Sequence, residues 1–246
     1  MNPSAYIEMQ ELEDSHWWFV ARRQIIYNLI GQFCPSPNKI LEVGCGTGGN
    51  LAMLSQFGEL KAFEMDSNAL AMANQKGISN LTLILGQCPD QLPFEGEQFD
   101  LICLFDVLEH IQEDSKTLVQ LKKYLTPRGK MIITVPAYPS LFGPHDQFLQ
   151  HHRRYSKVEL KKIIHQSGFK IKKISYFNFI LFPLAVLNRL VGLLMQRFID
   201  PERQTSVTKP SAIINLTLRY IFASERHLLR HSNLPFGLSL VCIVSI

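Results

Sequence analysis

The chain has 246 residues but few cysteines, and their pattern excludes several protein classes. There are five of them, an odd number, most lie inside apolar runs, and none forms a CxxC pair. A disulfide framework or a zinc ribbon would require paired cysteines. The first 18 residues, MNPSAYIEMQELEDSHWW, are acidic and lack the basic start and apolar core of a signal peptide. We therefore expect reduced thiols in a cytoplasmic protein.

A large excess of one charge is also lacking. The net charge of +4 comes from 25 basic and 21 acidic residues spread along the chain, so we expect no nucleic-acid partner. There is no internal repeat and no low-complexity tract. The most apolar segment, FNFILFPLAVLNRLVGLLMQRFI, is interrupted by Asn178, Pro183, Asn188 and Arg189, whereas a membrane span needs about 20 nearly uncharged residues.

What is present is an alternation of apolar, β-branched runs with segments of helical periodicity, which predicts a parallel sheet covered by helices on both faces. The predicted strands are 39–43, 60–64, 81–85, 100–105 and 130–135, followed by 170–177 and 238–246. The predicted helices are 49–57, 67–76, 113–125, 177–199 and 211–230, and one that begins at Ser156. Ser156 with Glu159 forms a capping box at the start of this last helix, and Gly168 is its candidate C-cap. This order predicts an α/β fold.

The stretch ILEVGCGTGGNL, residues 40–51, lies where the first strand ends and the first helix begins. Gly44, Gly46 and Gly48 there form a turn whose amides point toward a ligand at the helix N-terminus. Glu64 follows Gly44 by 20 residues at the end of the second strand, where a carboxylate can accept two hydrogen bonds from a ribose diol. Dinucleotide enzymes share this geometry, so the glycines alone do not name the cofactor.

Four motifs together resemble a known family. LEVGCGTG with Glu42 before the first glycine, FEMDSNAL, FDLICLFDVLEHI and LTPRGKMIITVP look like successive motifs of the class I S-adenosylmethionine-dependent methyltransferases. The resemblance covers residues 38–136. It implies a Rossmann-like sheet of seven strands with a reversed last strand, and S-adenosylmethionine as cofactor.

The resemblance also implies a set of cofactor-binding residues. The loop at Gly44 to Gly48 would hold the amino acid moiety, Glu64 the ribose, with Asp66 as its competitor, and Gln87 and Cys88 the adenine. An acidic residue is commoner than Gln87 at that position. Ten residues of this core are predicted to bind the cofactor, and the N-terminal segment described next adds Trp18 and Arg22: the ten are Glu42, Gly44, Cys45, Gly46, Gly48, Glu64, Met65, Gln87, Cys88 and Phe105.

HWWFVARR, residues 16–23, resembles the N-terminal signature of a bacterial subgroup of these enzymes, with FGPHDQFLQHHRRYS (142–156) as its second mark. Exposing two tryptophan side chains to water is energetically unfavourable, so we expect the segment to have a function. We interpret it as a lid helix, in which Trp18 packs on the cofactor and Arg22 or Arg23 pairs with the cofactor carboxylate. The alternative is a structural role only, in which the segment anchors a helix to the sheet by packing.

DVLEH follows the fourth strand, where the acceptor would meet the methyl group. In a helical turn Asp106 and His110 share a face, and we nominate His110 as the base or as a substrate contact. One alternative is a capped helix start, with Asp106 as N-cap and Glu109 at the third position. Another is a divalent-metal set of Asp106, Glu109 and His110, completed by a histidine from 138–155. Such a set suits Mg²⁺ poorly, and we expect no metal.

The densest polar cluster follows the fifth strand, in a loop that faces the ligand crevice of such a sheet. We expect it to recognise the acceptor, with Arg153 or Arg154 binding a carboxylate or phosphate and His145 as a further catalytic candidate. The alternative is a solvated loop. Its members are His145, Asp146, His151, His152, Arg153, Arg154 and Tyr155.

The domain organisation predicted is an N-terminal helical lid over 1–37, a cofactor-binding core over 38–176, and a helical insertion with the final strand over 177–246. We favour the insertion, 177–199, as a substrate cap. If it lies on a bilayer instead, with Arg189 and Arg197 toward the headgroups, it makes a peripheral membrane contact.

The function predicted is methyl transfer from S-adenosylmethionine to a hydroxyl oxygen of a small or lipid-linked acceptor. One alternative is an NAD-dependent Rossmann oxidoreductase. The other is a methyltransferase-like binding module without turnover. We expect a cytoplasmic protein, with membrane association as the outcome if the insertion lies on a bilayer.

Overall fold

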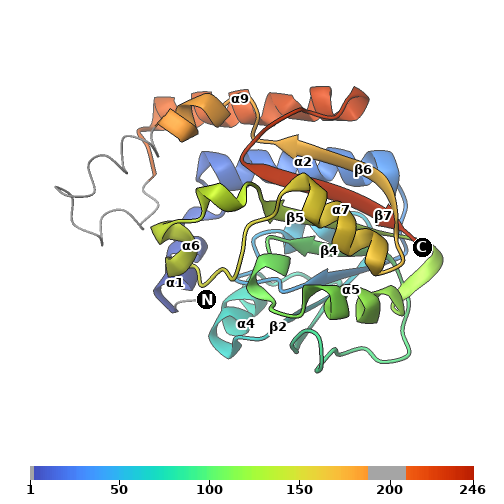
Figure 1. The fold of residues 1–246 in the computed structure, drawn as a ribbon. Helices are drawn as coiled ribbons and strands as arrows, with labels where there is room; N and C mark the ends of the chain where they lie inside the picture. The colour runs from blue at the N-terminus through green and yellow to red at the C-terminus, as the bar shows by residue number, and fades with distance from the viewer. Residues whose placement is uncertain (1–2, 188–208) are drawn as a thin grey trace.

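The computed structural model describes residues 3–187 and 209–246, and its centre is one seven-stranded sheet. The strand order is β3-β2-β1-β4-β5-β7-β6 (Figure 1). β7 runs antiparallel to both β5 and β6, and the other neighbouring pairs are parallel. The predicted seven-stranded sheet with a reversed last strand is confirmed.

The strands lie close to their predicted places. They are β1 Lys39–Val43, β2 Glu59–Glu64, β3 Leu81–Leu85, β4 Phe99–Phe105, β5 Leu125–Pro136, β6 Lys170–Phe177 and β7 Ser239–Ser245. β5 begins earlier than predicted, because Leu125 pairs with Phe99 before the register shifts and Lys130 pairs with Leu101. Pro127 and Gly129 lie within this irregular part.

Helices lie on both sides of the sheet (Figure 1). The α-helices are α1 Pro3–Leu12, α2 Trp17–Phe33, α3 Leu51–Leu54, α4 Ser67–Asn74, α5 Asp114–Lys122, α6 Pro144–Phe148, α7 Lys157–Gln166 and α9 Ala212–His231. The 3-10 turns are η1 Leu108–His110 and η2 Pro139–Leu141. α2 packs against α9, and α5 packs against α7.

Most predicted helices are present, and one that was not predicted begins the chain. α3 is shorter than the predicted helix over 49–57, and α7 has the predicted capping box, in which the Glu159 amide donates to Ser156 Oγ. Residues 182–187 are helical. The rest of the predicted helix over 177–199, with Arg189 and Arg197, lies outside the described residues. Sequence reasoning missed α1, whose signal is Pro3 in its first turn.

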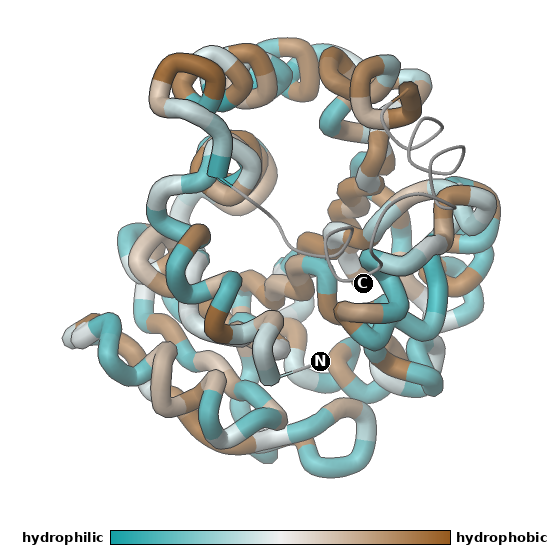
Figure 2. The backbone as a smooth tube through the Cα atoms, turned by 90° about the vertical axis from the view of Figure 1, so that its left-hand side faces the viewer, coloured by the Kyte–Doolittle hydropathy of each residue, from teal (hydrophilic) through white to brown (hydrophobic). Residues whose placement is uncertain are grey.

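The core lies between the sheet and its helices. Every residue of β7 except the last is buried, as expected for a strand covered on both faces. The edge strand β3 differs, because Ile84 and Leu85 are exposed. Figure 2 shows the hydrophobic strands surrounded by helices that alternate between hydrophobic and hydrophilic residues.

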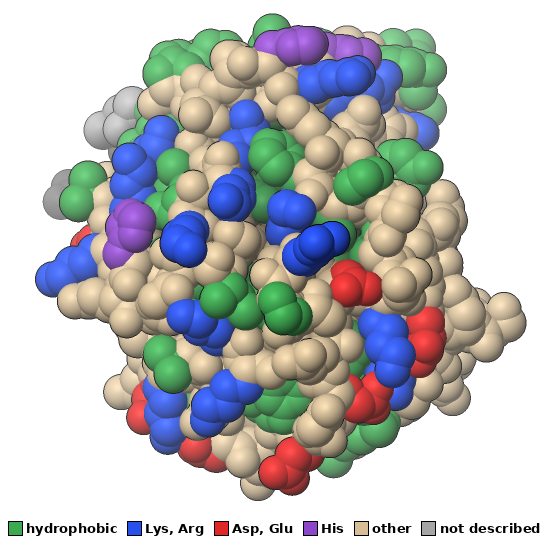
Figure 3. Space-filling view, turned by 90° about the vertical axis from the view of Figure 1, so that its right-hand side faces the viewer, with side chains coloured by type: hydrophobic (Ala, Val, Ile, Leu, Met, Phe, Trp, Pro, Cys, Tyr) green, Lys and Arg blue, Asp and Glu red, His purple; other side chains and the backbone are tan. Residues whose placement is uncertain are grey.

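The parallel strands all end on one side of the sheet, where α1 and α6 lie (Figure 1). The opposite side, shown in Figure 3, carries lysines and arginines in separate groups among neutral and hydrophobic side chains. Among the helices within residues 3–187 and 209–246, none combines the length and apolarity required to cross a bilayer. Because open α/β sheets bind their ligands beyond the carboxyl ends of the strands, we expect the ligand site on the side where α1 lies.

Candidate active site

A cavity of about 1440 Å³ opens beyond the carboxyl ends of the parallel strands. Its walls come from α1, α2, the loops after β1, β2, β3 and β4, and the segment around α6. Ten of the twelve predicted cofactor-binding residues line it, as do all three catalytic candidates. The lining members are Trp18, Arg22, Gly44, Cys45, Gly46, Glu64, Met65, Gln87, Cys88, Phe105, Asp106, His110 and His145.

The glycine turn after β1 has the left-handed backbone that its composition predicts. Gly44, Gly46 and Gly48 have φ angles of 64°, 55° and 90°. A Cβ on Gly46 would meet only Met9, at 3.8 Å, so the backbone is bare toward the cavity. Gly48 does not line the cavity, and a Cβ there would lie 2.9 Å from Leu51 and 3.1 Å from the Ala73 backbone. Gly48 therefore serves close packing between α3 and α4.

Glu64, at the end of β2, is the acidic residue that faces the cavity. Its carboxylate accepts hydrogen bonds from the amides of Gly46 at 2.8 Å and Met65 at 2.9 Å, and from the Tyr6 hydroxyl at 3.4 Å. Asp66 instead caps α4, accepting from the Asn68 and Ala69 amides. The geometry thus favours Glu64 over Asp66 as the ribose partner.

α1 covers the glycine turn. Thr47 Oγ1 donates to Glu13 Oε2 at 2.6 Å, and the Lys76 ammonium pairs with the same carboxylate at 2.6 Å. Burial, together with the charge of Glu64, raises the pKa of Tyr6 well above its ordinary value. The Tyr6 hydroxyl therefore stays protonated and donates to Glu64. α1 therefore covers the glycine turn, and both α1 and the segment 16–23, which lie within the predicted lid region 1–37, contribute to the cavity wall.

Glu42 lies beneath the turn and does not line the cavity. Its Oε1 accepts a hydrogen bond from Asn50 Nδ2 at 3.0 Å. Burial raises the pKa of Glu42 to about 8. The residue is therefore a buried, mostly protonated support that ties the end of β1 to the start of α3.

Gln87 and Cys88 line the cavity where the adenine contact is predicted. Gln87 and Gln91 exchange two backbone hydrogen bonds of 2.9 Å, which closes a tight turn under the site. Burial raises the pKa of Cys88 to about 12, so this thiol is protonated and contributes surface rather than a nucleophile.

Arg22 reaches from α2 to the ends of β4 and β5. Its guanidinium pairs with Asp106 Oδ2 at 2.5 Å, donates to Thr134 Oγ1 at 2.9 Å, and lies 5.1 Å from the centre of the Trp18 ring. Thr134 in turn donates to Asp106 Oδ1. Thr134 is a member of this network that sequence reasoning missed, because it lies inside an apolar strand. Arg23, the alternative partner of the cofactor carboxylate, instead donates to the Glu13 carbonyl.

The alternative of a helix start capped by Asp106 is wrong. Asp106 has a left-handed φ of 57°, and the segment after it is the short turn η1, flanked by Val107. Asp106 therefore turns toward Arg22, whereas His110 lies against His151, with ring centroids 4.6 Å apart. The helical face on which the sequence placed Asp106 and His110 together does not form.

His110 is less basic than the sequence interpretation assumed. Burial and, after it, the neighbouring His151 lower the pKa of His110 to about 3. The ring is neutral at physiological pH and can accept a proton, but it holds that proton weakly.

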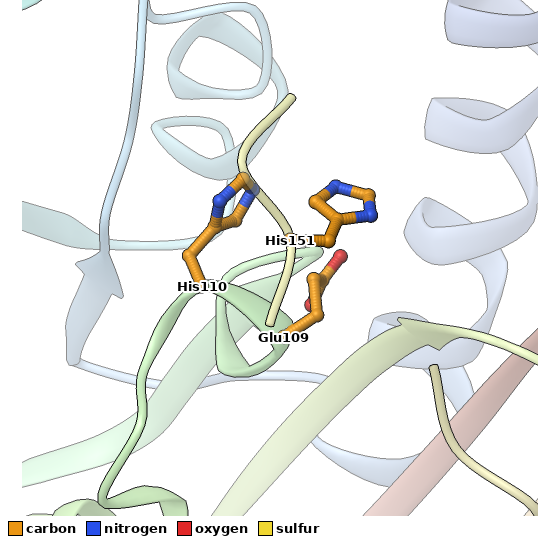
Figure 4. Close-up of side chains that lie close together, drawn as sticks. All are labelled: Glu109, His110 and His151. Carbon is orange, nitrogen blue, oxygen red and sulfur yellow. The ribbon is translucent and has the colours of Figure 1, made fainter. Parts of the chain in front are cut away.

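Glu109, named from the sequence in the capping and metal alternatives, and His151, named in the polar loop, also lie at this end. Glu109 is completely buried, and burial followed by the charge of Asp106 raises its pKa well above the ordinary range. His151 Nδ1 lies 3.0 Å from Asp146 Oδ1. Figure 4 shows Glu109, His110 and His151 gathered around one point.

The arginines of the polar loop are already paired. Arg154 Nε donates to Asp146 at 2.7 Å, and Arg153 donates to Asp114 at 2.9 Å and to the Gln112 carbonyl. Tyr155 is buried and donates to Asp114. These contacts anchor the loop to α5 and α6, so the predicted anion binding by Arg153 or Arg154 has no free guanidinium to support it. His145 lines the cavity.

Comparisons with known proteins agree with this geometry. Residues 20–174 match the family described as methyltransferase domain. A probable S-adenosylmethionine-dependent methyltransferase of Mycolicibacterium smegmatis is 21% identical over 65% of this chain and 62% of the relative. The demethylmenaquinone methyltransferase of Bacillus subtilis is 26% identical over 43% of this chain and 48% of the relative. The chain thus spans less than two thirds of the length of these relatives.

Solved structures share the fold. A phosphoethanolamine N-methyltransferase of Haemonchus contortus, solved in complex with S-adenosylmethionine, has a TM-score of 0.58 and 19% identity. That similarity covers 89% of this chain and 51% of the other.

Proposed function

The chain belongs to the methyltransferase-domain family, of the class I S-adenosylmethionine-dependent type, and we propose that it transfers a methyl group to a hydroxyl oxygen of a small or lipid-linked acceptor. The observation that carries the proposal is that one cavity is lined both by the glycine turn with Glu64 and by polar side chains that follow β4 and surround α6, which we call the cofactor end and the acceptor end. The glycine turn and Glu64 line the cofactor end. Asp106, His110 and His145 line the acceptor end.

The family match confirms the predicted enzyme class and S-adenosylmethionine as cofactor. It argues against the NAD-dependent oxidoreductase. A drug-sized ligand fills roughly 300 to 1,000 Å³, so a cavity of about 1440 Å³ has room for a cofactor and an acceptor together.

The cofactor supplies an activated methyl group, so the protein has to align the acceptor oxygen with it and exclude water. We propose that Glu64 holds the ribose and the turn at Gly46 holds the amino acid moiety. Arg22 would bind the cofactor carboxylate only if its guanidinium contacts that carboxylate and Asp106 at the same time. The acceptor proton would leave to a base at the other end, for which His110 and His145 are the candidates.

A lipid-linked acceptor is supported by two features. The demethylmenaquinone methyltransferase of Bacillus subtilis, by its name, acts on a lipid-like quinone. The start of the insertion borders the cavity through Asn178, and Glu225 of α9 fixes it by accepting from the amides of Phe179 and Ile180. We propose that 177–199 begins as a cap over the acceptor.

The experiment that tests the activity uses S-adenosylmethionine with a deuterated methyl group. Purified protein is incubated with metabolite and lipid extracts, and mass spectrometry finds the labelled product. We expect a labelled species that is absent with the Gly46→Val variant. Tight cofactor binding without any labelled product in either extract would favour the binding module without turnover.

A peripheral membrane contact is a separate proposal. Leu184 and Leu187 of the insertion are 60% and 59% exposed, and Ile213 at the start of α9 is 80% exposed. Leu184→Glu with Ile213→Glu should reduce sedimentation with anionic vesicles, whereas the change at exposed Val158 on α7, Val158→Glu, should not. Equal sedimentation of all three proteins would contradict the contact.

We also propose that HWWFVARR marks a bacterial subgroup and that the chain divides at about residues 37 and 176. In the structure this segment packs on α9, because Trp17 meets Phe222 edge to face at 5.9 Å. Both tryptophans also line the cavity.

A further inference from the structure

Glu109, His110 and His151 form a cluster at the acceptor end that the proposed methyl transfer does not use as a unit. Each offers one ligand atom, and these atoms lie within 4.8 Å of one another (Figure 4). Glu109 and His110 belong to η1 after β4, and His151 belongs to the loop after α6. All three line the cavity, so an ion bound there could meet an acceptor.

The Glu109 carboxylate is an unexplained group in this cluster. It is fully buried, and neither of its oxygens has a hydrogen-bond partner among the described residues 3–187 and 209–246. A buried carboxylate without a partner is costly, so the group either stays protonated or pairs with a cation or a metal ion. The two nearby cations are already paired, Arg22 with Asp106 and Arg154 with Asp146.

Both histidines are oriented by outer contacts. His151 Nδ1 is hydrogen-bonded to Asp146 Oδ1, which leaves Nε2 for a ligand. Asp146 is in turn held by Arg154 Nε at 2.7 Å and by the Gly143 amide at 2.9 Å. The His110 ring packs edge to face against the His151 ring, with centroids 4.6 Å apart. A carboxylate or carbonyl behind a histidine is the usual outer shell of a metal ligand, because it fixes the ring and its tautomer.

We propose that Glu109, His110 and His151 bind one divalent transition-metal ion of the Zn²⁺, Mn²⁺ or Fe²⁺ class. Two imidazoles and one carboxylate suit these ions, and water or an acceptor oxygen would complete the coordination. Ligand atoms about 2.1 Å from one ion lie about 3 to 4 Å apart, so the cluster closes by roughly 1 Å when the ion binds. Of the metal set considered from the sequence, Glu109 and His110 remain, His151 is the histidine from 138–155 that completes it, and Asp106 is not part of the cluster.

The site also gives a role in the reaction, which rests on the proposed function. An acceptor hydroxyl bound to the ion becomes more acidic. Its proton leaves to a base, its oxygen forms a bond to the methyl carbon, and the carbon–sulfur bond breaks with its electron pair left on sulfur. His110 is then a ligand, so the base would be His145.

The test measures metal binding alone, without cofactor or acceptor, so it does not depend on methyl transfer. Chelator-treated, tag-free protein is titrated with Zn²⁺ and with Mn²⁺ by calorimetry. We expect one ion per chain. Glu109→Gln, His110→Ala and His151→Ala should each weaken binding by more than the roughly 10- to 100-fold cost of losing an outer-shell partner.

The matched control is His165→Ala, because His165 is exposed on α7 and does not line the cavity. It should bind the ion as the original chain does. Binding of S-adenosylhomocysteine checks that each variant is folded. Equal metal affinity in folded His110→Ala, His151→Ala and His165→Ala proteins would overturn the site.

A second measurement needs no variant. Addition of Zn²⁺ to ¹⁵N-histidine-labelled protein should shift the Nε2 resonance of His151 and one ring nitrogen of His110, leaving His165 unchanged. Co²⁺ should give the visible spectrum of a protein-bound ion with nitrogen ligands. The absence of both signals at saturating metal would overturn the proposal.

Discussion

The two ends of the cavity are built in different ways. At the cofactor end, Glu64 and the glycine turn lie within about 20 residues of one another, and their hydrogen bonds come largely from backbone amides. At the acceptor end, side chains from α2, the turn after β4, α6 and the loop after α6 meet through two ion pairs and a histidine–carboxylate hydrogen bond. A local motif therefore defines the first end, and only the packing of distant segments defines the second.

The largest expected effect is at the acceptor end. Arg22→Met should lower the free energy of unfolding by about 3 kcal/mol, because it leaves the Asp106 carboxylate without its buried partner. Chemical denaturation measures the loss. Arg23→Met is the control, since its partner Asp14 is 70% exposed and their distance is 3.8 Å. Equal losses in the two variants would mean that the Arg22 pair is not a structural link.

The next effect is at the cofactor end. Gly46→Val should weaken S-adenosylhomocysteine binding at least about 100-fold, or about 2.7 kcal/mol, because a branched residue cannot hold this left-handed backbone next to the ligand. Gly77→Val is the matched control: its φ is 63°, it has open space, and it lies outside the cavity. Calorimetry should show that Gly77→Val keeps its affinity. If both variants lose affinity equally, strain alone explains the effect.

Glu64→Ala and Asp66→Ala separate the two acidic residues after β2. Glu64→Ala should weaken cofactor binding by about 1 to 3 kcal/mol, the cost of losing a charged hydrogen-bond partner. Asp66→Ala removes the cap of α4 and should cost about 0.5 to 2 kcal/mol of stability with cofactor affinity retained. The reverse pattern would transfer the ribose contact to Asp66.

The last test concerns the pH dependence of the support under the turn. The pKa of Glu42 in the folded protein is about 8 against 4.5 ordinarily, so its contribution to stability is complete below about pH 4.5 and is lost as the pH rises through about 8. The melting temperature of Glu42→Gln relative to the original chain should therefore rise between about pH 5 and pH 8 and then level off. A constant difference over this range would show that Glu42 is not protonated in the folded protein.

The strands and the cofactor turn could be predicted because their signals are local. A strand buried on both faces is an apolar run, and a turn that needs positive φ angles selects glycine at Gly44, Gly46 and Gly48. α1 escaped prediction because its helical sequence has little amphipathic periodicity, and it folds by covering Glu64 and Thr47.

The acceptor end was predicted by its residues but not by its contacts. DVLEH was interpreted as a helical turn, in which Asp106 and His110 would share a face. The backbone at Asp106 is left-handed instead, so Asp106 pairs with Arg22 and His110 meets His151. No spacing in the sequence relates residue 22 to residue 106, because their contact depends on how α2 packs beside the sheet.

The sequence by itself determined the order of strands and helices, the bare turn after β1 and the acidic residue after β2. Hydrophobic periodicity and the steric demands of glycine act over a few neighbouring residues, so they can be read from the chain. The tertiary structure alone decided which side chains meet at the acceptor end. Burial and pairing there depend on long-range packing, which gives the Asp106 carboxylate an arginine and leaves that of Glu109 beside two histidines.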